Sequence, residues 1–385
     1  MLDRILSPEG WPYASSPPVD EKDPGRFNTL FGRDSLITAL QVLPERPDVA
    51  RATLRALAAL QGRAFDPETE EEPGKIVHEY WRVAPARMLE RGWPVRDGEL
   101  RYYGSADSTP WFLAVLAATG DPALAGELEA AWRGAAAWLE RALERGGGLV
   151  RYGPGAPGCL SQQGWRDAID PLDPAGHGGG ILREDGRAPD PPLADADTQA
   201  VALVALRALE RLEPGRAGAG EAAHALARRI EDAFLPDVVA LEGHDRPVRG
   251  AGSQLGWLLW AGALSDAGAA RAAERLTRPD VLTGYGLRTL AEGHPRFEPH
   301  AYHRGTVWPF DSWLGWGGLR AAGYGDGAER VRSGVLAALE RLGGAPELYA
   351  VGPGGPELVG IANRVQAWSV GAEWALRNDW DARVI

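Results

Sequence analysis

Carboxylates beside aromatic residues and glycines recur along this chain, and they have the clearest chemical use of any combination in it. The segments that combine them are FGRDSLITALQ (31–41), EEPGKIVHEYW (71–81), RYYGSADSTPWF (101–112), SQQGWRDAID (161–170), GYGLRTLAEGHPRFEPHAYHRGTVWPFDSW (284–313), APELYA (345–350) and NRVQAW (363–368). Aromatic rings offer flat apolar faces that suit sugar rings, although packing explains most of the 15 tryptophans equally well. Two carboxyl groups can cleave a glycosidic bond, one by protonating the leaving oxygen and the other by activating water or attacking the sugar.

Asp167 and Glu347 are the candidate carboxyl pair. Asp167 stands in GWRDA beside Trp165, and an apolar ring next to a carboxyl raises its pKa by desolvation, as a general acid requires. Glu347 stands in GGAPELY, in a loop after an expected helix. Taken alone, each is more simply an ordinary charged side chain, so the residues by themselves leave the pair open.

Other chemistries lack their motifs. The chain has 7 His and a single cysteine, Cys159, without HExxH or CxxC, and His300 and His303 have no third partner nearby, so we expect no metal site. Neither GxGxxG nor a P-loop occurs, and we expect no cofactor. GxSxG is absent, which disfavours a serine hydrolase, and DADT (195–198) is not the aspartate-rich motif of terpene cyclases.

Composition limits the partners and the location. The net charge of −12, without a basic stripe, argues against nucleic acid. One cysteine excludes a disulfide framework. The N-terminal residues lack an apolar core of the signal-peptide type and no run of 18 apolar residues occurs, so we expect a cytoplasmic protein without a membrane partner. The sequence makes no prediction of oligomeric state.

Helical periodicity dominates the chain. Leu36, Ile37, Leu40 and Leu43 share one helix face, with Asp34-Ser35 as the expected N-cap. The expected helices, about twelve in all, cover about 36–43, 47–63, 76–90, 107–119, 122–145, 196–212, 217–234, 251–264, 266–277, 303–322, 326–342 and 362–376.

Consecutive helix pairs without a composition break predict one all-α domain over residues 1–385, with 1–25 as an N-terminal extension. We expect an (α/α)6 toroid of six inner and six outer helices, and no fixed repeat supports an α-solenoid instead. Long glycine- and proline-rich loops at 151–160, 171–193, 279–300 and 343–360 would form a funnel at one face.

Taken together, these segments resemble the catalytic domain of the bacterial amylo-alpha-1,6-glucosidase family, the glucosidase half of glycogen debranching enzymes. The match runs in order from about residue 26 to residue 375. The resemblance implies an (α/α)6 barrel without a metal and an inverting glycoside hydrolase that removes terminal α-linked glucose from glycogen or oligosaccharides. It also implies that Asp167 is the general acid and Glu347 the general base.

The resemblance extends to substrate-binding residues. Related barrels hold the hydroxyls of the terminal glucose with an Arg-Asp pair, which here would be Arg33 and Asp34. The further pocket residues implied are Asp107, His303, Trp308 and Gln366. Trp165 and Trp308 would stack on sugar faces.

The chain departs from the family pattern in three places. Arg304 in YHRG replaces a small polar residue such as Asn, and QAW lacks its usual preceding proline before Gln366. Family members commonly carry an N-terminal β-rich domain, whereas only about 25 residues precede the FGRDS segment here. An additional cation at Arg304 could bind an acidic aglycone, so the alternative substrate is a small α-glycoside such as mannosylglycerate or glucosylglycerate.

Two alternatives from other classes remain open. A sugar epimerase on a similar toroid would use His78 and His303 as acid and base and would leave the glycosidic bond intact. A non-catalytic carbohydrate-binding barrel would keep the pocket without using the carboxyl pair.

Overall fold

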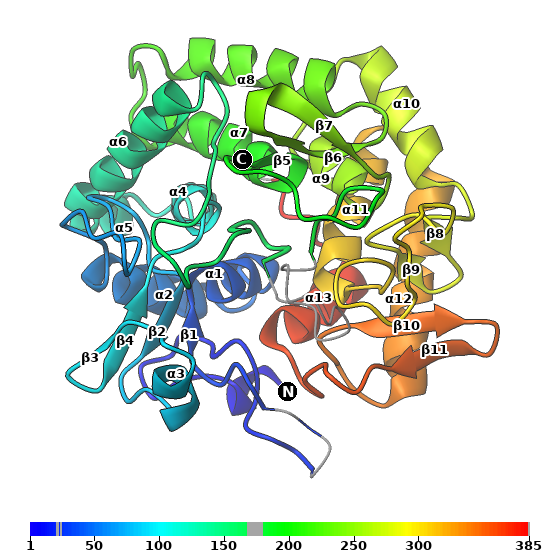
Figure 1. Cartoon of the computed structure of the whole chain (residues 1–385), viewed down its shortest axis with the longest axis horizontal. Helices are drawn as coiled ribbons and strands as arrows, with labels where there is room; N and C mark the ends of the chain where they lie inside the picture. Colours follow the sequence, from blue (N-terminus) through cyan, green and yellow to red (C-terminus); the bar gives the residue numbers. More distant parts are fainter. Residues whose placement is uncertain (21–22, 24, 168–179, 384–385) are drawn as a thin grey trace.

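Six helices form a closed inner ring (Figure 1). The computed structural model describes residues 1–20, 23, 25–167 and 180–383. In chain order the inner helices are α1 (Gly32–Gln41), α4 (Ser108–Ala118), α7 (Ala196–Leu212), α9 (Gln254–Trp260), α11 (Pro309–Ala321) and α13 (Ala367–Arg377). Each contacts the next, and α13 contacts α1 to close the ring. The predicted (α/α)6 toroid is therefore confirmed.

An outer layer of helices surrounds this ring. It consists of α2 (Pro47–Ala59), α6 (Glu129–Arg145), α8 (Ala219–Phe234), α10 (Asp266–Leu276) and α12 (Gly325–Leu342), each packed against an inner helix. Within the described ranges the sixth outer position holds no long helix, and the short turn η1 (Leu2–Arg4) contacts α13 there. The expectation of six outer helices is corrected to five.

Side-chain patterns explain which helices lie inside. Nearly every residue of α4 is buried, as expected for a helix that is covered on all sides. The outer helix α8 instead buries a stripe that includes Leu226, Ile230 and Phe234, while its other face meets solvent. Large aromatic residues of the inner helices, such as Trp111 and Trp313, are fully buried, and Trp111 packs against Trp257 and Trp260 of α9.

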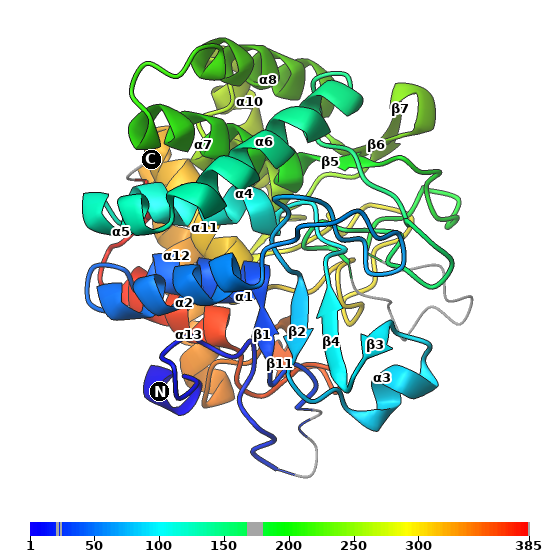
Figure 2. The same cartoon turned by 90° about the vertical axis from the view of Figure 1, so that its left-hand side faces the viewer.

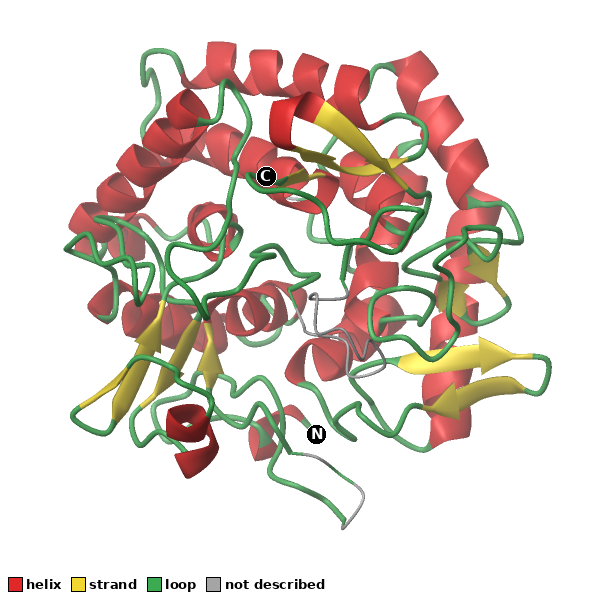
Figure 3. Cartoon of the chain, in the orientation of Figure 1, coloured by secondary structure: helices red, strands yellow, loops and turns green. Residues whose placement is uncertain are grey.

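Short antiparallel strands lie beyond one end of the helical barrel (Figures 2 and 3). The largest sheet has the order β1-β2-β4-β3, from β1 (Leu30–Phe31), β2 (Glu79–Trp81), β3 (Val95–Arg96) and β4 (Glu99–Tyr102). The other sheets pair β5 (Ala194–Asp195), β6 (Val238–Glu242) and β7 (Arg246–Arg249), then β8 (Leu282–Thr283) with β9 (Gly286–Leu287), and β10 (Tyr349–Gly352) with β11 (Gly355–Leu358). These strands give the long loops at that end a fixed shape.

The expected helix over 76–90 is wrong. Residues Glu79–Trp81 form β2, which pairs with both β1 and β4, and only Ala86–Glu90 form a short helix, α3. Strand pairing in the sheet therefore overrides the helical pattern of this segment. The expected helix over 122–145 is also divided, into α5 (Pro122–Glu127) and α6.

Several inner helices begin at a different residue from the one expected. α1 starts at Gly32 after the N-cap Phe31, so Arg33 and Asp34 lie in its first turn and the predicted Asp34-Ser35 N-cap is wrong. α11 starts at Pro309 and α13 at Ala367, each several residues later than expected. The residues before these helices are loops, which carry candidate site residues.

The predictions about a membrane span, the loop 171–193 and the domain organisation are tested only in part by the described residues. No described helix is long and apolar enough to cross a membrane. Residues 171–179 of the expected loop 171–193 lie outside the described residues. The single-domain organisation stays a prediction.

Candidate active site

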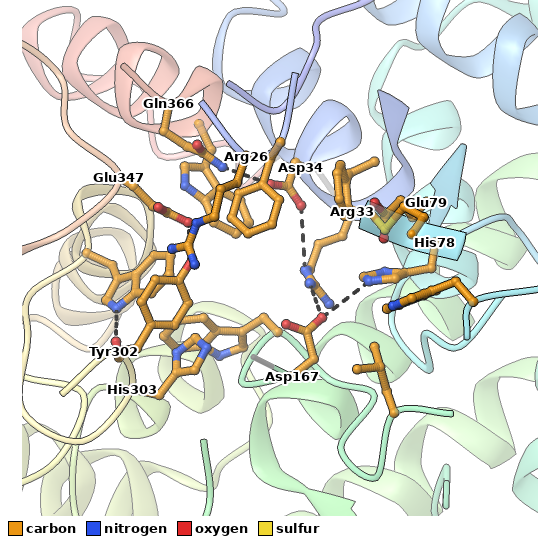
Figure 4. Close-up of a pocket in the computed structure, with 18 of the residues that line it drawn as sticks. Arg26, Arg33, Asp34, His78, Glu79, Asp167, Tyr302, His303, Glu347 and Gln366 are labelled. Atoms are coloured by element: carbon orange, nitrogen blue, oxygen red, sulfur yellow. Dashed lines mark hydrogen bonds and ion pairs between the residues drawn. The ribbon is translucent and has the colours of Figure 1, made fainter. Parts of the chain in front are cut away.

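A cavity of about 310 Å³ opens at the end of the barrel where the inner helices begin. Its lining combines four carboxyl groups, four arginines, two histidines and a set of aromatic rings. The lining residues are Arg26, Phe27, Phe31, Arg33, Asp34, His78, Glu79, Arg87, Met88, Arg91, Trp93, Leu160, Trp165, Asp167, Tyr302, His303, Trp308, Glu347, Gln366 and Trp368. Segments far apart in the sequence therefore meet at one pocket, as Figure 4 shows.

The first turn of α1 places a buried guanidinium at the base of this pocket. Gly32 lies so close to the neighbouring strand segment that a Cβ there would be 2.2 Å from the carbonyl oxygen of Val77. Arg33 is 3% exposed and donates from Nη1 to Asp107 Oδ1 at 3.1 Å and from Nη2 to Asp167 Oδ2 at 2.5 Å. Arg33 therefore connects α1 to the loop that carries the candidate acid.

Asp34 points into the pocket from the same turn (Figure 4). Its Oδ1 accepts a hydrogen bond from Gln366 Nε2 at 3.2 Å, and Arg33 Nε lies 3.9 Å from its Oδ2. Burial raises the pKa of Asp34 to about 7, against the opposing effect of Arg33, and Asp167 and Glu347 add repulsion. A polyhydroxy ligand would supply further hydrogen bonds to this buried carboxyl.

Asp167 lies on the loop before the undescribed segment, and 15% of its side chain is exposed. Besides Arg33, it faces His78, whose Nε2 is 3.6 Å from Asp167 Oδ2. Burial raises the pKa of Asp167 to about 6, although the ion pair with Arg33 lowers it. Burial and the Arg33 guanidinium together hold the pKa of His78 well below its usual range.

Glu347 lies across the opening from Asp167 (Figure 4). It is 1% exposed, and it accepts hydrogen bonds from the hydroxyl of Tyr302 and, at 3.0 Å, from the backbone N–H of Asn363. Burial raises the pKa of Glu347 to about 7, while the Tyr302 hydrogen bond opposes that rise. Two buried carboxyls on opposite sides of one pocket match the arrangement that glycosidic bond hydrolysis needs.

A protein-family model matches more than half of the chain. Residues 112–350 match the model of the mannosylglycerate hydrolase MGH1-like glycoside hydrolase domain. The chain belongs to this family. It is therefore a glycoside hydrolase by family membership and fold, and the resemblance to debranching enzymes holds at this coarser level. No curated protein matches the chain.

Solved structures support the fold of this family member. A GH63 mannosylglycerate hydrolase from Thermus thermophilus, in complex with Tris, is 18% identical with a TM-score of 0.69, and the match covers 97% of each chain. The same enzyme in complex with Tris and D-glycerate gives 18% identity and a TM-score of 0.68, again over 97% of each chain. A wild-type glycosidase is 15% identical with a TM-score of 0.57, over 99% of this chain and 94% of that one. At these identities the likeness establishes the shared barrel.

The structure brings most of the residues predicted for the glycoside hydrolase site to the pocket. Arg33, Asp34, Asp167, Glu347 and Gln366 meet there, as described above. Asp107 does not line the pocket, because it lies beneath Arg33 and is held by the Ser105 hydroxyl at 2.7 Å. Its position suits a counter-ion for Arg33, while direct sugar binding by Asp107 stays a prediction.

The two tryptophans that were predicted to stack on sugar faces, Trp165 and Trp308, are almost fully buried. Trp165 and Trp308 are each 1% exposed, although both border the pocket. The ring of His303 stacks on Trp308 with centroids 5.0 Å apart, and Trp165 meets His303 edge-on. Neither ring nitrogen of His303 has a hydrogen-bond partner among the described residues, so His303 is the better placed to contact a ligand.

Arg304 lies away from the cavity lining. Its Nη1 donates to the carbonyl oxygen of Arg296 at 3.1 Å, on the loop outside the pocket. Arg304 was expected near the pocket, where it could bind an acidic aglycone, but it does not line the cavity, whereas Arg26, Arg87 and Arg91 do.

Sequence reasoning gave several pocket residues no role in a glycoside hydrolase. His78 and Glu79 stood in a segment rich in chemical groups, but the segment was expected to be helical, whereas β2 holds Glu79 at the pocket. Tyr302 precedes His303 in a motif already singled out, and only the fold places its hydroxyl on Glu347. No three His, Cys, Asp or Glu side chains among the described residues are grouped to hold a metal ion.

Proposed function

We propose that this protein is an inverting hydrolase of a small α-glycoside whose aglycone carries a carboxylate, such as mannosylglycerate or glucosylglycerate. The observation that carries the proposal is a pocket lined by two sets of charged side chains. The buried carboxyls Asp34, Asp167 and Glu347 form one set, here named the buried wall, and the arginines Arg26, Arg87 and Arg91 form the other, here named the arginine wall.

The buried wall suits the sugar and the reaction. Asp167 would donate its proton to the glycosidic oxygen as the bond to the anomeric carbon breaks. Glu347 would accept a proton from the water that attacks that carbon from the opposite face. Arg33 and Asp34 would bind the sugar hydroxyls, with Arg33 exchanging part of its contact with Asp167 for the ligand.

The arginine wall suits an anionic aglycone. None of Arg26, Arg87 and Arg91 forms an ion pair with another described residue. Arg87 Nη2 donates to the carbonyl oxygen of Arg26 at 3.0 Å, so two of the three are adjacent. A carboxylate between such side chains gains charge-assisted hydrogen bonds that a neutral group does not.

The size of the cavity also favours a small substrate. Its volume of about 310 Å³ is at the lower end of the roughly 300–1,000 Å³ typical of small-molecule sites. Side chains from α3 and the residues after it, including Met88 and Trp93, line part of this cavity. Family membership and the D-glycerate complex of the Thermus enzyme with the same fold agree with this substrate class.

A pair of substrates that differ only in the carboxylate tests the proposal. We expect kcat/KM for α-mannosylglycerate or α-glucosylglycerate to exceed that for the matching glycosylglycerol by about tenfold to a hundredfold, since one charge-assisted contact contributes about 1.5–3 kcal/mol. Equal rates on the acid and the neutral analogue would contradict the anionic aglycone. Faster release of glucose from isomaltose or panose would favour the debranching activity that the sequence motifs suggest.

A further inference from the structure

The loop that carries Asp167 is attached to the barrel partly through a buried carboxylate, Asp197, in the first turn of α7. Oδ2 of Asp197 accepts two hydrogen bonds, from Trp165 Nε1 at 2.8 Å and from Arg166 Nε at 2.9 Å. These donors belong to the two residues directly before Asp167. Asp197 is 1% exposed and does not line the pocket, so it does not touch a ligand there.

The contacts of Arg166 extend this attachment across the barrel. Its Nη1 donates to the carbonyl oxygen of Thr289 at 3.0 Å, and its Nη2 donates to the hydroxyl of Ser253 at 3.1 Å. The guanidinium also lies over the ring of Trp165, with Cζ 4.5 Å from the ring centroid. Three segments of the chain therefore fix the backbone immediately before Asp167.

The opposite side of Asp167 is held by a second chain of charges. Asp107 binds Arg33 through both carboxylate oxygens, at 3.1 and 3.3 Å, and Arg33 binds Asp167. A sugar that engages Arg33 competes for this contact, whereas Asp197 and Arg166 do not line the pocket, so a ligand there does not compete for the hydrogen bond between them. Asp197 is then the anchor that keeps the acid in place during the reaction.

We infer that Asp197 is a positioning residue for Asp167, orienting the general acid toward the leaving oxygen through Trp165 and Arg166. The inference rests on the proposed function, in which Asp167 gives its proton to that oxygen. It assigns a role to the DADT segment, which matches no catalytic motif by sequence.

A comparison of two leaving groups separates this role from a structural one. An α-glycoside with an alkyl aglycone needs the proton of Asp167, because an alkoxide leaves poorly. The α-glycosyl fluoride of the same sugar releases fluoride as an anion, water adds at the anomeric carbon, and Glu347 still takes the proton from water. A variant in which only the acid is misplaced should therefore hydrolyse the glycoside more slowly but hydrolyse the fluoride at nearly the parent rate.

The variant to measure is Asp197→Asn, which removes the charge with little change of shape, with Asp197→Ala as a second variant that removes both accepted bonds. We expect Asp197→Asn to lower kcat on the glycoside by about tenfold to a hundredfold, part of the roughly 10²–10⁴ that acid–base catalysis contributes. Its rate on the fluoride should stay within about threefold of the parent chain.

Glu242→Gln is the matched control. Glu242 is a buried carboxylate that accepts hydrogen bonds from Arg183 Nε at 2.9 Å and from the backbone N–H of Asp190 at 2.7 Å, but it accepts none from residues 165–167. We expect Glu242→Gln to retain the parent ratio of glycoside to fluoride rates. The fluoride rate also reports whether each variant has folded.

Other results would contradict either the role of Asp197 or the proposed function on which that role rests. Equal losses on glycoside and fluoride, or no loss on either, would show that Asp197 does not act through the acid, as would the same selective loss in Glu242→Gln. Asp167→Asn measured alongside separates the two failures. If it keeps the parent rate on the glycoside, the assignment of the acid is wrong; if it loses only the glycoside while Asp197→Asn does not, the inference alone fails.

Discussion

The two sets of charged side chains in the pocket differ in how they are held. In the buried wall, Asp167 pairs with Arg33, which also pairs with Asp107, and the residues Trp165 and Arg166 before Asp167 both donate to Asp197. In the outer part of the arginine wall, here named the outer wall, Arg87 and Arg91 come from α3 and the residue after it, and Arg91 is exposed. This difference supports the proposal that the buried wall binds the sugar and carries the chemistry, while the outer wall binds the aglycone.

Removing either carboxyl of the buried wall should have the largest effect. We expect Asp167→Asn and Glu347→Gln each to lower kcat on the glycoside by about 10³-fold or more, because each substitution removes one proton-transfer step. Steady-state kinetics on mannosylglycerate and glucosylglycerate would measure this. Near-parent rates for Glu347→Gln would remove Glu347 from the mechanism.

Replacing Arg33, which bridges Asp107 and Asp167, should have the next largest effect. Lysine in place of Arg33 would carry one ammonium, which cannot bridge Asp107 and Asp167 as the guanidinium does. We expect Arg33→Lys to lower kcat/KM about a hundredfold, with a raised KM because the sugar hydroxyls lose their donor. Arg183→Lys is the control, since Arg183 pairs with Asp190 and Glu242 outside the pocket. A similar loss in both variants would mean that the effect is not specific to the site.

Changing the outer wall should alter substrate preference more than rate. We expect Arg87→Ala to raise KM for the acidic glycoside about tenfold with little change in kcat, because one charge-assisted contact is lost. The neutral glycosylglycerol should be cleaved as before. If KM rose equally for both substrates, Arg87 would serve packing against Trp81, over which its guanidinium lies, rather than carboxylate binding.

The smallest effect concerns stability and depends on pH. Burial raises the pKa of Glu347 from 4.5 to about 7 in the folded chain, so its ionisation costs stability as the pH rises from about 4.5 to about 7. We expect Glu347→Gln to stabilise the fold by about 1–3 kcal/mol at pH 8 and by almost nothing at pH 4.5. Urea unfolding at both pH values would measure this, and equal differences at the two pH values would contradict the buried charge.

Much of the site could be predicted because it lies in short motifs. FGRDS, GWRDA and PELY carry Arg33, Asp34, Asp167 and Glu347 in local contexts that depend little on the rest of the fold. The toroid was also predictable, since about twelve helical segments follow one another in pairs without a composition break.

Other features depend on contacts that no local pattern encodes. The strand at Glu79 exists because β1 and β4 pair with it on both sides. Asp197 acts through donors that are 31 and 32 residues away. Arg87 and Arg91 lie in a segment of ordinary helical composition, and only the path of the chain after β2 brings them to the pocket mouth.

The stereochemistry of the released sugar tests the central claim most directly. The parent chain should be incubated with α-mannosylglycerate and α-glucosylglycerate, and the anomeric protons should be followed by NMR from the first minutes. Because water attacks opposite the leaving group when Glu347 activates it, we expect the β-anomer to appear first and the α-anomer only by later mutarotation. Initial release of the α-anomer, or no hydrolysis of either compound, would contradict the account.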